Sequence, residues 1–269
     1  MHPLSVVILT RNEETGIATC IESAKQVSDD IIIIDSGSND NTLLISSLMG
    51  ARCFSLDWQG FGFARNFGAA QARHDWIIAL DADERISKKL AQQINKTGLA
   101  DNCVYKFRRE NYLGNVKMKF GAWGFDTVKR IYNRRYAKWN AAIVHEKIIS
   151  DQRLKYKFLP GTIVHYGFKD FNAYKNKVII YARLSAEKYF LQGRKSNFLK
   201  KICSPLFNSL KSYFLQFGFL DGWDGLRLAY MIGYYSWLKY FYLQEINSQA
   251  SHEDFSETKM NVASNRSFF

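Results

Sequence analysis

Two aspartates on alternate positions, Asp81 and Asp83, are the residues of this sequence best suited to chemistry. They follow directly on the apolar run at residues 76–80, which has the composition of a buried strand. At a strand end, one carboxylate can hold a divalent cation while the other contacts a ribose or a water molecule. A Mg²⁺ or Mn²⁺ ion placed there can bridge a diphosphate and neutralise it as it leaves. The alternative is an acidic connection between strand and helix, in which one aspartate caps the next helix.

Asp35 occupies an equivalent place after a second apolar run, at residues 31–34. Its carboxylate could accept a hydrogen bond from a nucleobase N–H, while Asn39 or Asp40 could cap the helix that follows. Arg65 precedes the Asp81 strand and could face a base or a diphosphate. The spacing alone favours the other reading of Arg65, as a solvated surface side chain.

The elements that must position these residues alternate along the chain. Strands are predicted at residues 4–9, 31–34, 51–55 and 76–80, and helices at residues 17–27, 41–49 and 62–72. This alternation indicates a parallel sheet with crossover helices, whose ligands bind beyond the carboxyl ends of the strands. Strand-like pieces at residues 104–107, 128–132, 143–149 and 161–166 indicate mixed or antiparallel additions to that sheet.

The remainder of the chain has a helical pattern. Helices are predicted at residues 171–189, 198–217 and 225–243. We therefore expect a catalytic domain at residues 1–168, a helical, basic and aromatic region at residues 169–247, and a loose tail at residues 248–269.

Charge is distributed unevenly over the 269 residues, whose net charge is +12. Residues 1–100 carry −3, residues 101–168 carry +9 and residues 169–215 carry +8. The basic part suits an anionic partner, and nucleic acid, anionic lipid and a phosphorylated glycan all fit. Four widely spaced cysteines exclude a disulfide scaffold. We expect neither a targeting segment nor a spanning helix, since the apolar run at residues 228–238 falls short of the roughly 20 residues that a bilayer requires.

Several of these segments together resemble family 2 of the glycosyltransferases, inverting enzymes with the GT-A fold. The similarity lies in residues 6–14, 34–40, 59–62, 64–66 and 80–84. A narrower similarity, to lipopolysaccharide core β-1,4-glucosyltransferases, lies in residues 58–62, 109–114, 144–146, 164–166 and 219–222. The resemblance covers about residues 4–245. It implies an α/β fold of the GT-A type, with a mainly parallel sheet flanked by helices and a helical, basic C-terminal extension.

The resemblance also implies a site for a UDP-sugar. The residues expected to bind the nucleotide sugar are Arg11, Asn12, Asp35, Arg65 and Asp81. Asp35 would contact the uracil and Asp81 the ribose. Asp83 would bind a divalent cation, Mn²⁺ or Mg²⁺, and His165 would be a further ligand of the metal or contact of the diphosphate.

Glu146 is the candidate for the catalytic base that the resemblance supplies. Direct displacement at an anomeric carbon needs a base that takes the proton of the acceptor hydroxyl, and a carboxylate facing the sugar can serve. The alternative for Glu146 is an ion pair with one of the nearby lysines or arginines. His145 and His165 have a structural alternative as well, since a histidine beside a strand often serves packing.

We therefore expect a metal-dependent hexosyltransferase. It would move a hexose, glucose foremost, from a UDP-sugar to a lipopolysaccharide or lipooligosaccharide core or a similar lipid-linked glycan. A dehydrogenase or a nucleotidyltransferase is disfavoured because no glycine-rich loop follows the first strand. The remaining alternative is a non-enzymatic basic protein that binds a membrane or a nucleic acid.

The C-terminal helices decide the expected location. Basic residues such as Lys195, Lys200 and Lys201 flank apolar stretches, and aromatic residues crowd residues 230–242. Such helices lie on anionic membranes, although they could instead simply pack on the catalytic domain. We expect a cytoplasmic protein that is peripheral on the inner face of the cytoplasmic membrane. Its partners would be a UDP-sugar, a lipid-linked acceptor and an anionic membrane surface, without nucleic acid, and salt would weaken its attachment.

Overall fold

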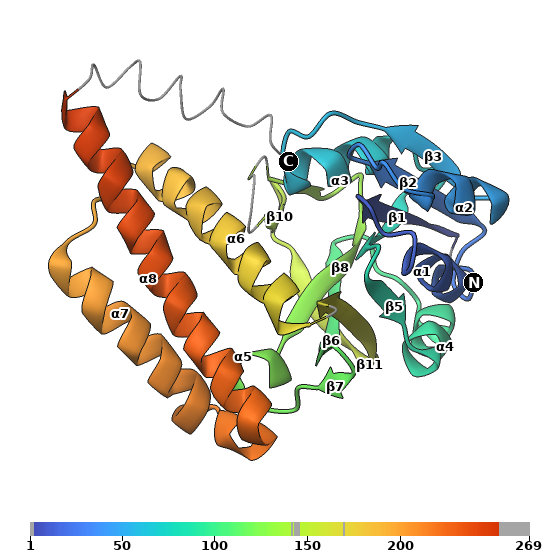
Figure 1. Ribbon diagram of the computed structural model, residues 1–269. Coiled ribbons are helices and arrows are strands. Elements are labelled where there is room, and N and C mark those ends of the chain that lie inside the picture. Colours follow the sequence, from blue (N-terminus) through green and yellow to red (C-terminus); the bar gives the residue numbers. More distant parts are fainter. Residues whose placement is uncertain (1–2, 141, 143–145, 169, 253–269) are drawn as a thin grey trace. The chain divides into compact units, whose positions relative to one another are not determined.

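The computed structural model describes residues 3–140, 142, 146–168 and 170–252. Its first part contains four parallel strands in the order β3-β2-β1-β4 (Figure 1). These are β1 (Leu4–Thr10), β2 (Asp30–Asp35), β3 (Arg52–Ser55) and β4 (Trp76–Asp81). They alternate with α1 (Ile17–Ala24), α2 (Thr42–Leu48) and α3 (Phe61–Ala70). The predicted alternation of strands and helices is confirmed.

The sheet continues with antiparallel strands, as the sequence predicts. β8 (Thr127–Asn133) pairs with β4, and β6 (Cys103–Leu113) pairs with β8. β5 (Glu84–Ile86) pairs with β11 (Lys155–Phe168). The remaining short strands are β7 (Val116–Lys117), β9 (Lys138–Trp139) and β10 (Ile148–Ile149). Of the strand predicted at residues 143–149, the described part contains only β10: residues 146 and 147 are not in a strand, and residues 143–145 lie outside the described residues.

The chain does not pass from Asp81 and Asp83 into a helix, so the capping alternative for these aspartates is wrong. It turns back into β5, which pairs antiparallel with β11. Helix α4 (Lys88–Lys96), which was not predicted, begins after β5, and the Ser87 hydroxyl caps it by accepting a hydrogen bond from the Leu90 amide at 3.2 Å.

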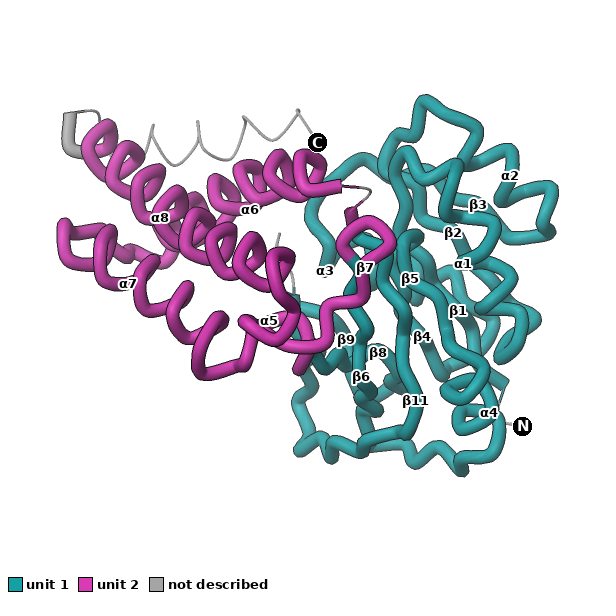
Figure 2. The backbone as a smooth tube through the Cα atoms, turned by 60° about the horizontal axis from the view of Figure 1, so that its bottom comes forward, with its two compact units in different colours: residues 1–112, 126–167 teal, residues 113–125, 168–269 magenta. Residues whose placement is uncertain are grey.

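The chain divides into two compact units (Figure 2). Unit 1 consists of residues 1–112 and 126–167, and unit 2 of residues 113–125 and 168–269. The expected boundary at residue 168 therefore needs a correction, since Leu113–Phe125 belongs with the helical part of the chain. The physical reason is hydrogen bonding: Asp221 accepts from the amides of Lys119 at 3.0 Å and Phe120 at 2.8 Å.

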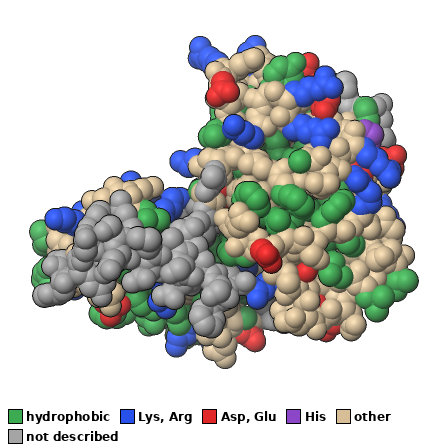
Figure 3. Space-filling view, turned by 90° about the horizontal axis from the view of Figure 1, so that it is seen from above, with side chains coloured by type: hydrophobic (Ala, Val, Ile, Leu, Met, Phe, Trp, Pro, Cys, Tyr) green, Lys and Arg blue, Asp and Glu red, His purple; other side chains and the backbone are tan. Residues whose placement is uncertain are grey.

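Unit 2 is built mainly from helices. On the face of the protein that Figure 3 shows, basic and hydrophobic side chains are interspersed where the surface is not grey. The helices are α5 (Gly121–Gly124), α6 (Phe171–Leu191), α7 (Phe198–Leu210), the π-helix η1 (Lys211–Leu215), the 3-10 helix η2 (Gly218–Asp221) and α8 (Gly222–His252). Because α8 continues to His252, the predicted tail does not begin at residue 248, and residues 253–269 lie outside the described part. Within the described residues, no helix combines the length and apolar content needed to cross a bilayer.

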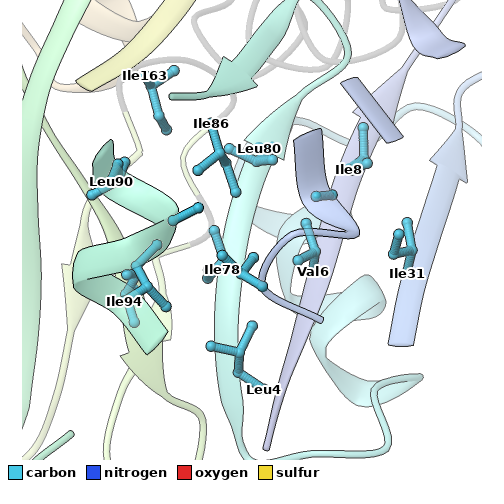
Figure 4. Close-up of a cluster of buried hydrophobic side chains, with 14 of the residues drawn as sticks. Leu4, Val6, Ile8, Ile31, Ile78, Leu80, Ile86, Leu90, Ile94 and Ile163 are labelled. Carbon is cyan, nitrogen blue, oxygen red and sulfur yellow. The ribbon is translucent and has the colours of Figure 1, made fainter. Parts of the chain in front are cut away.

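The core of unit 1 lies on both faces of the parallel strands. Every residue of β1 is buried. Val6 and Ile8 pack on one face, in the cluster drawn in Figure 4, whereas Val7 and Leu9 pack on the other. Because neighbouring residues of a strand point to opposite faces, an uninterrupted apolar run suits a strand covered on both sides. This sheet holds the strand ends that carry the candidate site.

Candidate active site

The loops after β1 and β2 are joined by hydrogen bonds. The Asn12 amide donates to the Ser38 hydroxyl at 2.8 Å, and the Asn12 side-chain oxygen accepts from the Asn39 amide at 2.8 Å. Asn12 has a left-handed backbone with φ of 53°, which asparagine tolerates better than most residues. Arg11 beside it is exposed. The structure thus places Arg11 and Asn12 next to the loop that begins at Asp35.

Asp35 ends β2 and holds its own loop. Its side chain accepts from the amides of Gly37 at 3.0 Å and Ser38 at 2.9 Å, and from the Ser38 hydroxyl. Gly37 has a φ of +89°, a conformation in which glycine carries no steric penalty. Asp35 is buried, with 1% exposure, so its carboxylate has a fixed position at the carboxyl edge of the sheet.

Arg65 is buried, with 2% exposure, which corrects the expectation of a solvated surface arginine. Helix α3 approaches the sheet closely because Gly68 faces it: a Cβ on Gly68 would lie 2.4 Å from the Val7 side chain. Arg65, one turn earlier, then reaches two carboxylates. Its Nη2 atom is 2.7 Å from Asp81 Oδ1, and its Nε atom is 3.0 Å from Glu146 Oε1.

Asp81, at the end of β4, contacts two guanidinium groups. Besides Arg65 on Oδ1, Arg130 Nη2 donates to Asp81 Oδ2 at 2.7 Å. Burial by itself raises the pKa of Asp81, but the positive charges of Arg130 and Arg65 outweigh it and hold this pKa far below its ordinary value. Asp81 is therefore a charged carboxylate whose two oxygens are each held by a guanidinium group.

Glu84 is a central member of the cluster that the sequence did not single out. It is fully buried and accepts from Arg130 Nη2 at 2.9 Å and from Arg109 Nη1 at 3.2 Å. Its second oxygen accepts from the Asp81 amide at 3.1 Å. Glu84 therefore fixes the turn that carries Asp81 and Asp83.

Asp83 and His165 are brought together by the pairing of β5 with β11. His165 lies opposite Glu84 in that ladder, and the Tyr166 amide donates to the Asp83 carbonyl at 3.0 Å. His165 Nε2 consequently lies 3.3 Å from Asp83 Oδ2. On its other side, His165 Nδ1 is 2.7 Å from the Asn111 side-chain oxygen, and Asn111 donates its amide N–H to Asp126 at 3.2 Å.

This chain of hydrogen bonds determines which nitrogen of His165 is available. Because Asn111 donates to Asp126, its oxygen faces His165, and an oxygen of this kind only accepts. With Nδ1 as the donor to Asn111, Nε2 is the nitrogen that could ligate a cation shared with Asp83. A hydrogen bond from the other ring nitrogen commonly orients a histidine that ligates a metal.

The donor set fits a divalent cation. An imidazole nitrogen and a carboxylate oxygen, 3.3 Å apart, can both ligate one ion. Within the described residues, no group of three or more His, Cys, Asp or Glu side chains could hold a metal. A cation here would therefore take most ligands from substrate phosphates and water, which is usual for Mg²⁺.

The described cluster contains five carboxylates and three guanidinium groups, so its side chains carry two more formal negative charges than positive ones. The carboxylates are those of Asp81, Asp83, Glu84, Asp126 and Glu146, and the guanidinium groups are those of Arg65, Arg109 and Arg130.

Glu146 belongs to this cluster through its ion pair with Arg65, so the pairing that the sequence offered as an alternative is present. Its side chain keeps 14% exposure, which leaves it accessible to a substrate. The third nitrogen of the Arg65 guanidinium, Nη1, is buried and has no hydrogen-bond partner among the described residues, so it retains a donor for a ligand. His145 lies outside the described residues.

The sequence also did not predict three further residues of the site, Arg109, Asn111 and Arg130. For Arg130 a local signal existed: it stands between apolar residues of its strand, Val128 before it and Ile131 after it, and a charged residue buried there calls for a buried partner. Arg109 and Asn111 lie in a segment of the narrower family resemblance, but no local pattern reveals their contacts, because their partners Glu84, Asp126 and His165 are 15 to 54 residues distant.

The fold and the cluster define the class first: a mixed α/β protein of the GT-A type, with a charged site at the carboxyl edge of its parallel strands. The family follows from comparison, since residues 5–175 match the profile of Glycosyl transferase family 2. The chain belongs to this family of glycosyltransferases. The non-enzymatic alternative is accordingly set aside.

Individual relatives extend the comparison. An uncharacterized glycosyltransferase of Rickettsia typhi is 25% identical over 273 residues, which cover 97% of this chain and 93% of the relative. The lipopolysaccharide core biosynthesis glycosyltransferase LpsC of Rhizobium meliloti is 26% identical over 251 residues, covering 85% and 90%. Among solved structures, glucosyl-3-phosphoglycerate synthase of Mycobacterium tuberculosis with Mn²⁺, UDP-glucose and glycerol 3-phosphate matches with a TM-score of 0.35 and 23% identity. That match covers 41% of this chain and 44% of that chain.

Proposed function

We propose that this chain transfers a hexose, with glucose as the expected sugar, from a UDP-sugar to a lipopolysaccharide or lipooligosaccharide core or a similar lipid-linked glycan. The observation that carries the proposal is the cluster in which Arg65 joins Asp81 to Glu146, next to the facing pair Asp83 and His165. The acceptor class is supported by the name of LpsC, which aligns with 85% of this chain. The work would take place at the inner face of the cytoplasmic membrane.

In this proposal the nucleotide lies along the carboxyl edge of the parallel strands. Asp35 receives the N–H of the uracil, with Arg11 and Asn12 beside it, and Asp81 receives a ribose hydroxyl. The free donor of Arg65, Nη1, suits a phosphate oxygen. Asp83 and His165 would hold Mn²⁺ or Mg²⁺, which when bound neutralises the negative charge of the departing diphosphate.

Glu146 acts as the base. Its carboxylate accepts the proton of the acceptor hydroxyl while the hydroxyl oxygen forms a bond to the anomeric carbon. The bond from that carbon to the diphosphate breaks at the same time, and its electron pair leaves with UDP. Because attack and departure lie on opposite sides, the anomeric configuration inverts. Arg65 keeps Glu146 oriented through the 3.0 Å contact.

The experiment is a titration of the purified protein with UDP, in the presence and absence of Mn²⁺ or Mg²⁺, together with a screen of UDP- and ADP-sugars for transfer and hydrolysis. We expect the metal to strengthen UDP binding about tenfold or more in the parent, and Asp83→Ala to lose that gain and the activity. The matched control is Asp29→Ala, at an aspartate whose side chain is 89% exposed. Unchanged turnover and metal response in Asp83→Ala would show that the metal assignment is wrong.

A further inference from the structure

The outward face of α7 is apolar. No residue of α7 is buried. Large apolar side chains that are more than half exposed run along α7 and η1: Phe198, Leu199, Leu206, Phe207, Leu210, Phe214 and Leu215. Leu199, Leu206 and Leu210 are separated by seven and four residues, so they form one stripe along the helix. A helix on a water-soluble protein normally turns such a stripe toward the core.

Small and polar residues lie at the contact between α7 and α8. Asn208 donates to the Ser236 hydroxyl at 2.8 Å, and the Ser209 hydroxyl donates to the Ala229 carbonyl at 2.8 Å. A Cβ on Gly233 would lie only 2.2 Å from the Ser209 hydroxyl oxygen, so the two backbones approach closely. Small residues and side-chain hydrogen bonds between helices, with large apolar residues outside, are the arrangement of helices surrounded by lipid.

Helix α8 adds an aromatic row. Tyr230, Tyr234, Trp237 and Phe241 stack in succession, with ring centroids 6.2, 6.1 and 5.3 Å apart. Tyr230 is 62% exposed and Trp237 is 42% exposed. Tyrosine and tryptophan are enriched where hydrocarbon meets water at a membrane surface.

The charge of this segment is of one sign. Residues 188–220 contain six basic residues and no acidic residue. The basic residues are Lys188, Arg194, Lys195, Lys200, Lys201 and Lys211. This charge complements an anionic surface. It also argues against a second copy of the chain as the occupant, because two such faces would repel one another.

We propose that α7 and η1 lie flat on an anionic lipid bilayer, with their apolar face buried at the boundary between headgroups and acyl chains and their lysines among the headgroups. The proposal goes beyond the transferase reaction, because it requires neither donor nor acceptor. It also differs from attachment through charge alone. Salt screens the lysines, with a Debye length of about 3 Å at 1 M, but leaves the buried leucines in place.

The experiment uses the full chain and vesicles of phosphatidylglycerol and phosphatidylcholine. Cys203 is exposed and lies between Leu199 and Leu206, whereas Cys20 and Cys103 are buried and Cys53 is half-buried. With Cys53 replaced by serine, an environment-sensitive fluorophore can therefore be attached at Cys203. We expect its emission to shift to the blue when anionic vesicles are added. A substantial fraction of the protein should still sediment with the vesicles in 1 M salt. The proposal would be overturned if the parent protein showed no emission shift and no sedimentation with the vesicles, or if 1 M salt released it completely.

A triple variant tests the stripe itself. Leu199→Gln, Leu206→Gln and Leu210→Gln together should lower vesicle affinity about tenfold or more, because glutamine keeps the helix and removes the apolar contact. The matched control is Leu44→Gln with Leu48→Gln on α2, where both leucines are more than half exposed.

Two readouts without vesicles make the outcome unambiguous. Both variants should match the parent in thermal melting and in UDP titration, which shows that they are folded. A parent protein that does not bind UDP would count against the transferase proposal alone. Light scattering gives the oligomeric state. If the triple variant binds vesicles like the parent, or instead breaks a dimer into monomers, the lipid assignment of this face is wrong.

Discussion

At the scale of single residues, Arg65 sets the geometry of the candidate site. It contacts Asp81 and Glu146, which come from strand β4 and from the segment before β10. Its guanidinium carbon also lies 5.0 Å from the centre of the Trp139 ring, so three sides of the group are occupied. A planar group with several fixed donors can hold two carboxylates at a set separation, which a lysine in its place could not do.

Glu146→Gln tests the base. Glutamine keeps the shape and can still meet Arg65 with its carbonyl oxygen, but it cannot take a proton. We expect the rate of sugar transfer to fall by about 10²-fold or more while UDP-sugar binding persists. Single-turnover rates and donor titrations measure the two quantities separately. Near-normal transfer would move the role to another carboxylate of the cluster, and Asp126→Asn would then be the variant to compare.

At the scale of elements, the close approach of α3 to the sheet is what buries Arg65. Gly68 is the residue that permits it, since an added Cβ would lie 2.4 Å from Val7 and 2.9 Å from Ile34. Both neighbours are fully buried in the second core cluster and have little room to move.

Gly68→Ala should therefore lower the free energy of unfolding by about 1–3 kcal/mol, the usual cost of overpacking a core. We also expect weaker UDP binding, because α3 carries Arg65. Urea denaturation measures the first effect. Gly98→Ala is the control, since nothing lies within 4 Å of the added carbon. Equal stability of the two variants would mean that α3 does not depend on this contact.

Elements differ in how well the sequence predicts them. The strands β1, β2 and β4 were predicted because their apolar runs are uninterrupted and end in polar turns. Helix α4 was not predicted, because it is nine residues long and only Leu90, Ala91 and Ile94 give it an apolar face. The burial of Arg65 could not be predicted, since its partner Glu146 is 81 residues distant and no local pattern reports such a pair.

At the scale of the whole molecule, buried carboxylates make stability depend on pH. Asp30, with 1% exposure, accepts from the Ser5 hydroxyl, from the Arg73 amide at 2.8 Å and from Arg52 at 2.7 Å. Burial alone raises the pKa of Asp30, but these hydrogen bonds and the charge of Arg52 outweigh it, so the pKa lies below its ordinary value. A depressed pKa means stability that is present above about pH 4 and lost as the pH falls further.

Asp30→Asn should lower the free energy of unfolding by about 2 kcal/mol at pH 7, the scale of hydrogen bonds to a charged group. The difference from the parent should shrink toward pH 3, because Asp30 of the unfolded chain then takes up a proton and the charged form no longer favours the folded state as strongly. Urea denaturation at pH 7, 5 and 3 measures this. Asp151→Asn, at an exposed aspartate of the described residues, should follow the parent at each pH. A difference that stays constant down to pH 3 would contradict the assignment.

The bonds from Asp221 to the amides of Lys119 and Phe120 have a consequence for biosynthesis. A ribosome adds about 5–20 residues per second, so Leu113–Phe125 emerges on the order of 5–20 seconds before Asp221 exists. All segments of unit 1 are complete once residue 167 has been made. The nascent chain can therefore assemble the carboxylates and arginines of the site before the helices that pack with Leu113–Phe125 have been synthesised. Unit 2 is completed last.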